Sequence, residues 1–135
     1  AGAGDARAAA ITALEALGAR VRIAVADVGD ERALRASLAA HDAAAWPAIR
    51  GVIHCAGVHR PAPLDQLAAD DLLPDLRSKV LGAWLLDRLL ADLDLFVLFS
   101  SAATQLGSPL LGGYAAPTRS STRSPTIAGR AASPR

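Results

Sequence analysis

Three residues have polar side chains in positions that could serve chemistry: Lys79, Ser101 and Tyr114. Serine and tyrosine hydroxyls can donate and accept hydrogen bonds, and a lysine ammonium can donate them and carries a positive charge. Ordinary packing explains a single serine or tyrosine equally well, so the argument depends on how the three are placed.

The position of Lys79 is the most informative. Ala83, Leu86 and Leu90 follow it at i+4, i+7 and i+11, so the lysine belongs to an apolar helical stripe. Arg77 and Arg88 lie on a different face of the same helix. A lysine on an inward face needs a partner or a cleft, although snorkelling of the ammonium to solvent is the ordinary alternative.

Polar or small residues also follow each predicted strand. Asp27 and Val28 come directly after the predicted strand 21–26. The stretch H-C-A-G begins at His54, the last residue of the predicted strand 51–54, and ends with Ala56 and Gly57. Ligands of open α/β sheets bind at the carboxyl ends of the strands. Asp27 could instead be a turn or cap residue, and His54 and Cys55 are expected to be buried spectators.

The predicted elements alternate, which indicates an α/β fold with a parallel, doubly wound sheet. Helix 5–17 ends before Gly18, helix 30–40 is capped by Asp30, and helix 72–92 has Pro74 in its first turn or at a break. Strand 95–99 is uniformly apolar, which is typical of a strand buried on both faces. The strands and helices are expected at 5–17, 21–26, 30–40, 51–54, 72–92 and 95–99.

Composition limits the classes of function. The chain has 135 residues, 52% of them hydrophobic, and a net charge of +1, which predicts one globular domain without a nucleic-acid surface. No apolar run is long enough to cross a membrane. The single cysteine excludes an internal disulfide and is compatible with the cytoplasm. No metal site is predicted.

Residues 117–135 differ from the rest of the chain. They are basic and rich in Ser, Thr and Pro, without acids, so we expect a disordered tail behind a domain at 1–116.

Four stretches together resemble the ketoreductase domains of type I modular polyketide synthases, in the short-chain dehydrogenase/reductase superfamily. They are A-D-V at 26–28, H-C-A-G-V at 54–58, S-K-V-L-G-A-W-L-L at 78–86, and F-V-L-F-S-S-A-A at 96–103 leading to G-Y-A-A at 113–116. Ser101 precedes Tyr114 by 13 residues, as in that family. The ordered set is specific, whereas A-D-V or S-S-A-A alone is not.

The resemblance implies a Rossmann-like fold and a role for each residue. Tyr114 would be the proton donor, Ser101 would bind the ketone, and Lys79 would hold the nicotinamide ribose and lower the tyrosine pKa. Asp27 and Val28 would flank the adenine, and Ala56 and Gly57 would line the cofactor ribose and nicotinamide. The implied reaction is reduction by NADPH of a β-ketoacyl thioester bound to an acyl carrier protein, beside other synthase domains.

Two features depart from the family pattern. The family opens with a strand and a Gly-rich turn, T-G-G-x-G-x-L-G, which holds the cofactor phosphates and is not found around Gly2 and Gly4. We therefore expect a truncated domain that is inactive as an isolated chain. A non-catalytic reductase-like subdomain that braces a synthase, or another nucleotide-binding module, stays an alternative.

The family also has an asparagine four residues after the tyrosine, where this chain has Thr118. Codons can be chosen for 117–135 whose shifted frame encodes asparagine at 118 and apolar residues at helical spacing. This favours the hypothesis of a one-base change of reading frame near codon 117, against a genuine basic tail.

Overall fold

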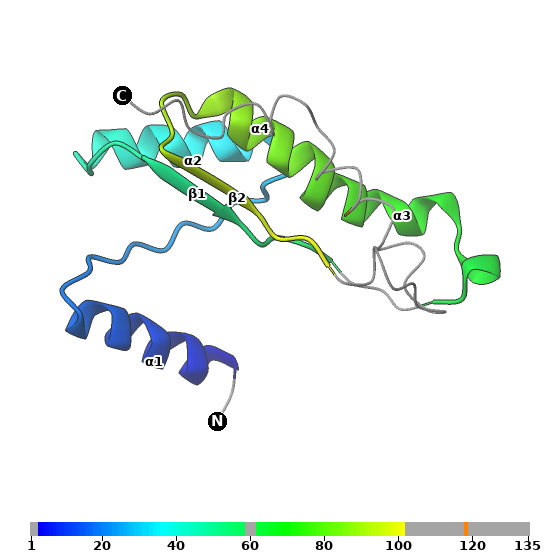
Figure 1. Ribbon diagram of the computed structural model, residues 1–135, viewed down its shortest axis with the longest axis horizontal. Helices are drawn as coiled ribbons and strands as arrows, with labels where there is room; N and C mark the ends of the chain where they lie inside the picture. Colours follow the sequence, from blue (N-terminus) through cyan, green and yellow to red (C-terminus); the bar gives the residue numbers. More distant parts are fainter. Residues whose placement is uncertain (1–2, 59–61, 102–117, 119–135) are drawn as a thin grey trace.

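The computed structural model describes residues 3–58, 62–101 and 118. Its elements run α1 (Ala3–Ala16), α2 (Glu31–Ala43), β1 (Gly51–His54), the short 3₁₀ turn η1 (Leu64–Gln66), α3 (Ala69–Asp75), the π-helix η2 (Leu76–Leu81), α4 (Gly82–Leu89) and β2 (Leu95–Leu98). The segments α3, η2 and α4 form one continuous helix that joins β1 to β2 (Figure 1).

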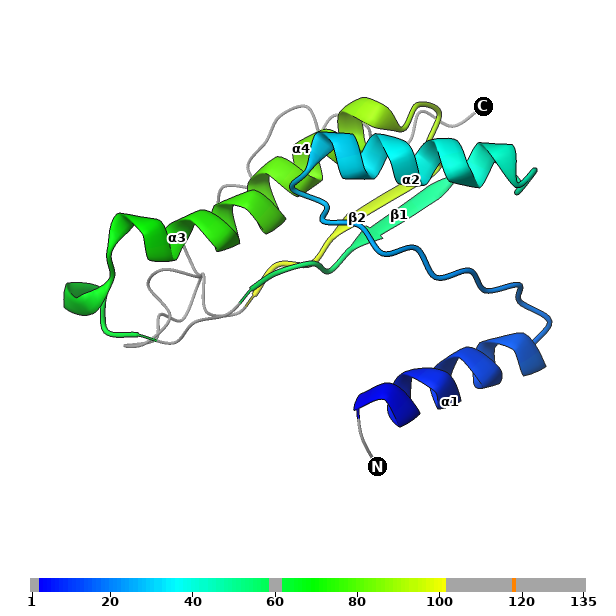
Figure 2. The same cartoon turned by 180° about the vertical axis from the view of Figure 1, so that it is seen from behind.

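The two strands pair in parallel, in register from Gly51 opposite Leu95 to His54 opposite Leu98. This confirms the predicted parallel sheet and two of its three predicted strands, 51–54 and 95–99, the second to within one residue at its end. In both ribbon views α2 and the long helix lie along the strand pair, whereas α1 stands apart from it (Figures 1 and 2). The fold is therefore a partial Rossmann-like unit.

Local sequence explains where the first two helices end or begin. α1 ends in a Schellman motif: Gly18 has φ +87°, and the amides of Gly18 and Ala19 donate to the carbonyls of Glu15 and Leu14. The Asp30 side chain accepts a hydrogen bond of 3.0 Å from the Ala33 amide and caps α2, as predicted.

The long helix begins at Ala69, three residues before the predicted start. The Asp71 side chain accepts a hydrogen bond of 3.0 Å from the Ala68 amide and stabilises this earlier first turn. Pro74 consequently lies in the second turn of α3, not in the first, and the helix changes to π geometry two residues later. The helix ends at Leu89, because Leu90 is extended.

Two expectations about strands are wrong for the described residues. Residues 21–26 form no strand: Val25 is 97% exposed, and no described strand lies beside this segment to supply the hydrogen bonds of a ladder. β2 is not buried on both faces either, since Leu95 is 51% exposed. Of the described helices, α2 and the long helix lie along the strand pair on one side (Figures 1 and 2).

The buried apolar side chains are few. Leu34 of α2 and Ala83 and Leu85 of α4 form the buried hydrophobic set of the described residues. Among the described helices, none is long and apolar enough to span a bilayer.

Candidate active site

The carboxyl ends of β1 and β2 define one edge of the sheet. Beyond the last paired residues, the Phe99 amide donates a hydrogen bond of 3.1 Å to the His54 carbonyl and keeps the two chains together. The loops that carry Ala56, Gly57 and Ser101 therefore leave the sheet from the same edge. Of these residues Gly57 is exposed, whereas Ala56 and Ser101 are half-buried.

Lys79 reaches this edge from the helix. It lies in η2 and is only 5% exposed. Its Nζ donates to the Phe99 carbonyl at 3.5 Å, and a Cβ added to Gly57 would stand 3.0 Å from Lys79 Cε. The predicted inward position of Lys79, on one stripe with the buried Ala83, is confirmed, and the lysine brings a positive charge to the strand ends.

His54 is buried beside this lysine, and Cys55 is exposed. The expected burial is therefore confirmed for His54 and wrong for Cys55, because successive residues at a strand end point to opposite sides of the sheet. His54 Nε2 donates a hydrogen bond of 3.0 Å to the Ser78 carbonyl. Burial lowers the pKa of His54 from its ordinary value, and the charge of Lys79 lowers it further, while the hydrogen bond to Ser78 opposes both effects.

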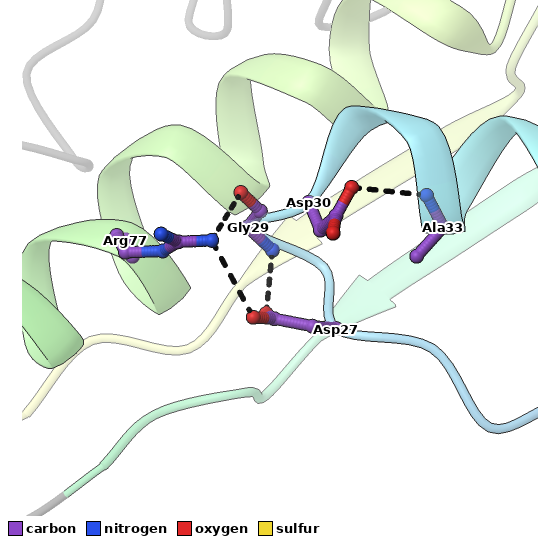
Figure 3. A network of polar contacts seen from close by, with 5 residues as sticks. All are labelled: Asp27, Gly29, Asp30, Ala33 and Arg77. Carbon is purple, nitrogen blue, oxygen red and sulfur yellow. Dashed lines mark hydrogen bonds and ion pairs between the residues drawn. The ribbon is translucent and has the colours of Figure 1, made fainter.

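Asp27 begins a tight turn in front of α2. Its Oδ1 accepts a hydrogen bond of 2.8 Å from the Gly29 amide, and its carbonyl accepts one of 3.0 Å from the Asp30 amide. The ordinary alternative for Asp27, a turn residue, thus describes its local role. Its carboxylate is still half open to solvent and faces the helix (Figure 3).

Arg77 is the residue of this region that the sequence did not predict. Its Nη2 lies 3.7 Å from Asp27 Oδ2 and donates to the Gly29 carbonyl at 3.3 Å (Figure 3). Arg88, expected on the same face, instead stacks over Trp84 at 5.0 Å. Nothing in the spacing of Arg77 on its helix indicates a partner 50 residues earlier in the chain; the available signal was that a negative charge at Asp27 needs a cation from another part of the fold.

The turn also packs tightly against the helix. A Cβ on Gly82 would stand 2.9 Å from Val28 Cγ2, and a Cβ on Gly29 would stand 3.0 Å from the Arg77 carbonyl. Val28 and Asp27 are therefore held against the helix that carries Lys79. This contact joins the predicted adenine-binding residues to the predicted nicotinamide-binding ones.

A pocket of about 530 Å³ lies between the Asp27 turn, the loop after β1 and the first half of the long helix. Its size is that of a small-molecule site. The residues that line it are Asp27, Val58, Asp70, Leu73, Pro74, Arg77 and Ser78.

Tyr114, the predicted acid, lies outside the described residues. The other six predicted site residues are described, and among them the side chain of Lys79 lies against the backbone of Gly57. Thr118, at the position of the family's asparagine, is described and fully buried. The described residues contain no group of three or more His, Cys, Asp and Glu side chains placed to hold a metal ion.

Residues 1–121 match the KR domain family. The chain is 48% identical over 103 residues to erythronolide synthase EryA3 of Saccharopolyspora erythraea, which covers 76% of this chain and 3% of that protein. It is 40% identical over 106 residues to the lovastatin diketide synthase lovF of Aspergillus terreus, covering 78% of this chain and 4% of that protein. The chain thus spans a small part of these synthases.

Solved structures give the same result. The ketoreductase PlmKR1, from the first module of phoslactomycin biosynthesis in Streptomyces sp. HK803, superposes with a TM-score of 0.72 at 39% identity, over 80% of this chain and 25% of that one. A gluconate 5-dehydrogenase from Burkholderia cenocepacia, solved with NADP and tartrate, gives 0.63 at 26% identity, over 71% and 40%. The family match, these relatives and the parallel strand pair agree: the chain belongs to the KR domain family, the polyketide synthase ketoreductases of the short-chain dehydrogenase/reductase superfamily.

Proposed function

We propose that this chain carries the reducing centre of a polyketide synthase ketoreductase. The reaction is the reduction of a β-ketoacyl thioester, bound to an acyl carrier protein, to the β-hydroxyacyl thioester. The observation that carries the proposal is Lys79, a buried cation at the carboxyl ends of two parallel strands, between Gly57 and the Phe99 carbonyl. A subdomain that only braces its neighbours has no use for a lysine in that place.

The described residues fit NADPH as the cofactor. Gly57 lacks a side chain where one would meet Lys79, so the cofactor ribose and nicotinamide can approach the ammonium beside Ala56 and Gly57. Asp27 and Val28 border the other end of the same edge, where the adenine would lie, and Asp27 also lines the pocket there. When bound, NADPH supplies the hydride that is added to the ketone carbon.

The proton that accompanies the hydride is supplied and positioned by residues of the chain. Ser101 donates a hydrogen bond to the ketone oxygen, and Tyr114 gives that oxygen its proton as the carbonyl becomes an alcohol. Lys79 binds the ribose hydroxyl groups and, as a cation, lowers the pKa of the Tyr114 phenol. The proton is thereby available at neutral pH, where an ordinary phenol holds it firmly.

The proposed setting is a cytoplasmic synthase in which other domains present the carrier-bound substrate. The 135 residues contain no Gly-rich turn of the T-G-G-x-G-x-L-G type. Such a turn supplies amide donors for the pyrophosphate. We therefore propose that these 135 residues do not reduce a ketone on their own.

The test is a reconstituted domain. An upstream Gly-rich βαβ unit from a related reductase is joined to the chain, and one base is restored near codon 117, which places an asparagine four residues after Tyr114. The chimera is expected to oxidise NADPH in the presence of a small ketone such as a decalone. Tyr114→Phe and Lys79→Ala should each lower the rate by about 10²-fold or more, and Ser101→Ala somewhat less. A chimera that binds NADPH and in which Tyr114→Phe reduces as fast as its parent would refute the assignment of the acid.

A further inference from the structure

His54 belongs to a closed ring of contacts that includes Lys79. The imidazole Nε2 donates to the Ser78 carbonyl at 3.0 Å, and Ser78 directly precedes Lys79. Lys79 Nζ donates to the Phe99 carbonyl at 3.5 Å, and the Phe99 amide donates at 3.1 Å to the His54 carbonyl. The ring therefore links the ends of β1 and β2 to the segment of helix that carries the lysine.

That segment has an unusual geometry. The Gly82 amide donates to the Arg77 carbonyl, five residues back, so the turn containing Lys79 is a π turn and not an α turn. π turns are rare and need support from their surroundings. His54 gives this support at two points, because its ring bonds Ser78 and also lies beside Gly82, where an added Cβ would be 3.4 Å from Cε1.

We propose that His54 is a positioning residue for Lys79. The imidazole bonds the Ser78 carbonyl and thereby fixes the position of the backbone next to Lys79. This position determines that the Lys79 side chain reaches Gly57 and the Phe99 carbonyl. This role rests on the proposed function, in which the lysine must meet both the cofactor ribose and the catalytic phenol. His54 acts through the helix and does not touch the substrate, because its Nε2–H is already engaged by a backbone carbonyl in the interior.

The test uses the only lysine in the sequence. Since all other cationic side chains are arginines or histidines, acylation of side-chain amines in the complete 135-residue chain reports on Lys79 alone. The rate is measured by peptide mass spectrometry after brief exposure to acetic anhydride at pH 8. The burial of Lys79 keeps this rate low in the parent chain.

His54→Leu removes the donor and should raise the acylation rate about 5-fold, the effect of losing one hydrogen bond. His54→Gln keeps an amide donor at the same distance along the side chain and should restore the slow rate. His41→Leu is the matched control, because His41 Nε2 also donates to a carbonyl, that of Pro47 at 2.9 Å, away from Lys79. It should leave the rate of Lys79 unchanged.

Circular dichroism melts establish that each variant is folded. If His54→Leu does not fold, His54→Asn replaces it, since its shorter amide cannot span the distance to Ser78 that the glutamine spans. Equal acylation rates in His54→Asn and His54→Gln, or a folded His54→Leu with the parental rate, would overturn the proposal. The readout is the amine and not ketone reduction, so this inference and the proposed function can fail separately.

Discussion

The backbone of Gly57 and the side chain of Lys79 lie so close that a Cβ on Gly57 would stand 3.0 Å from Lys79 Cε and 3.3 Å from Nζ. Both distances are shorter than ordinary packing contacts between such atoms. The absence of a side chain at position 57 therefore defines the space that the ammonium occupies.

Gly57→Val should displace the end of Lys79 from the strand edge, at a cost on the scale of about 1–3 kcal/mol for overpacking. We expect faster acylation of Lys79 in the chain and slower ketone reduction in the chimera, with Gly57→Ala between the parent and Gly57→Val. Gly51→Ala is the control, because its Cβ would meet Leu95 Cβ at an ordinary 3.6 Å. Parental acylation and reduction rates in Gly57→Val would contradict the packing.

Arg77→Ala should weaken the binding of NADPH by a few fold, within the roughly 1 kcal/mol that exposed ion pairs contribute. The arginine holds the Asp27 turn, which borders the proposed adenine site, so KM for NADPH should rise in the chimera while kcat stays unchanged. Reduced nicotinamide mononucleotide, which lacks the adenosine half, should be used equally well by both proteins. Arg88→Ala, which removes a cation stacked over Trp84, is the control. An equal loss with both cofactors would show that Arg77 does not act through the adenine side.

The free energy of unfolding should decrease as the pH falls from 7.5 to about 5.5. The pKa of His54 is lowered in the folded chain by burial, so below its ordinary value of 6.5 the unfolded chain binds more protons than the folded one. Above that value both states are neutral at this residue, and the pH dependence ends. His54→Gln should flatten the dependence in urea melts, whereas His41→Gln should retain it. The same slope in His54→Gln and the parent would assign the effect to other groups.

The 135-residue chain alone should not bind NADPH in a fluorescence or calorimetric titration, because its sequence provides no Gly-rich turn for the pyrophosphate. Attachment of the upstream βαβ unit should restore binding. A saturable dissociation constant in the low micromolar range for the chain by itself would show that another segment holds the phosphates.

Short sequence patterns predicted the helix ends and the strand that depend mainly on neighbouring residues. The strand at 51–54, the Asp30 cap and the Gly18 turn follow from patterns of a few residues, and the inward face of Lys79 follows from its spacing to Ala83. Residues 21–26 have the same β-branched pattern as a strand, yet a strand also requires a neighbour. A short stretch of sequence does not show whether a neighbouring strand will be present, and no described strand lies beside residues 21–26. This prediction was therefore wrong for the described residues.

In the site, the helical spacing predicted the inward position of Lys79 but not its contacts. The approach of Lys79 to Gly57 and Phe99 depends on how the helix packs. The same is true of the ion pair between Arg77 and Asp27, which are 50 positions apart. The roles of Ser101 and Tyr114 stay predictions, because Tyr114 lies outside the described residues.

The π turn at Leu76–Leu81 holds one residue more than an α turn, so it can be regarded as an insertion preserved within a continuous helix. Because the wide turn takes up that residue, its removal would restore α geometry and leave the two halves of the helix facing much as they do now. Forcing all of the residues into α geometry would instead rotate one half by about 100° relative to the other. The first half, with Leu73 and Pro74, lines the pocket beside Asp27, and the second half buries Ala83 and Leu85 against the rest of the domain. The wide turn therefore accommodates one more residue in the segment that carries Lys79 while each half of the helix keeps the face that it presents to its own surroundings.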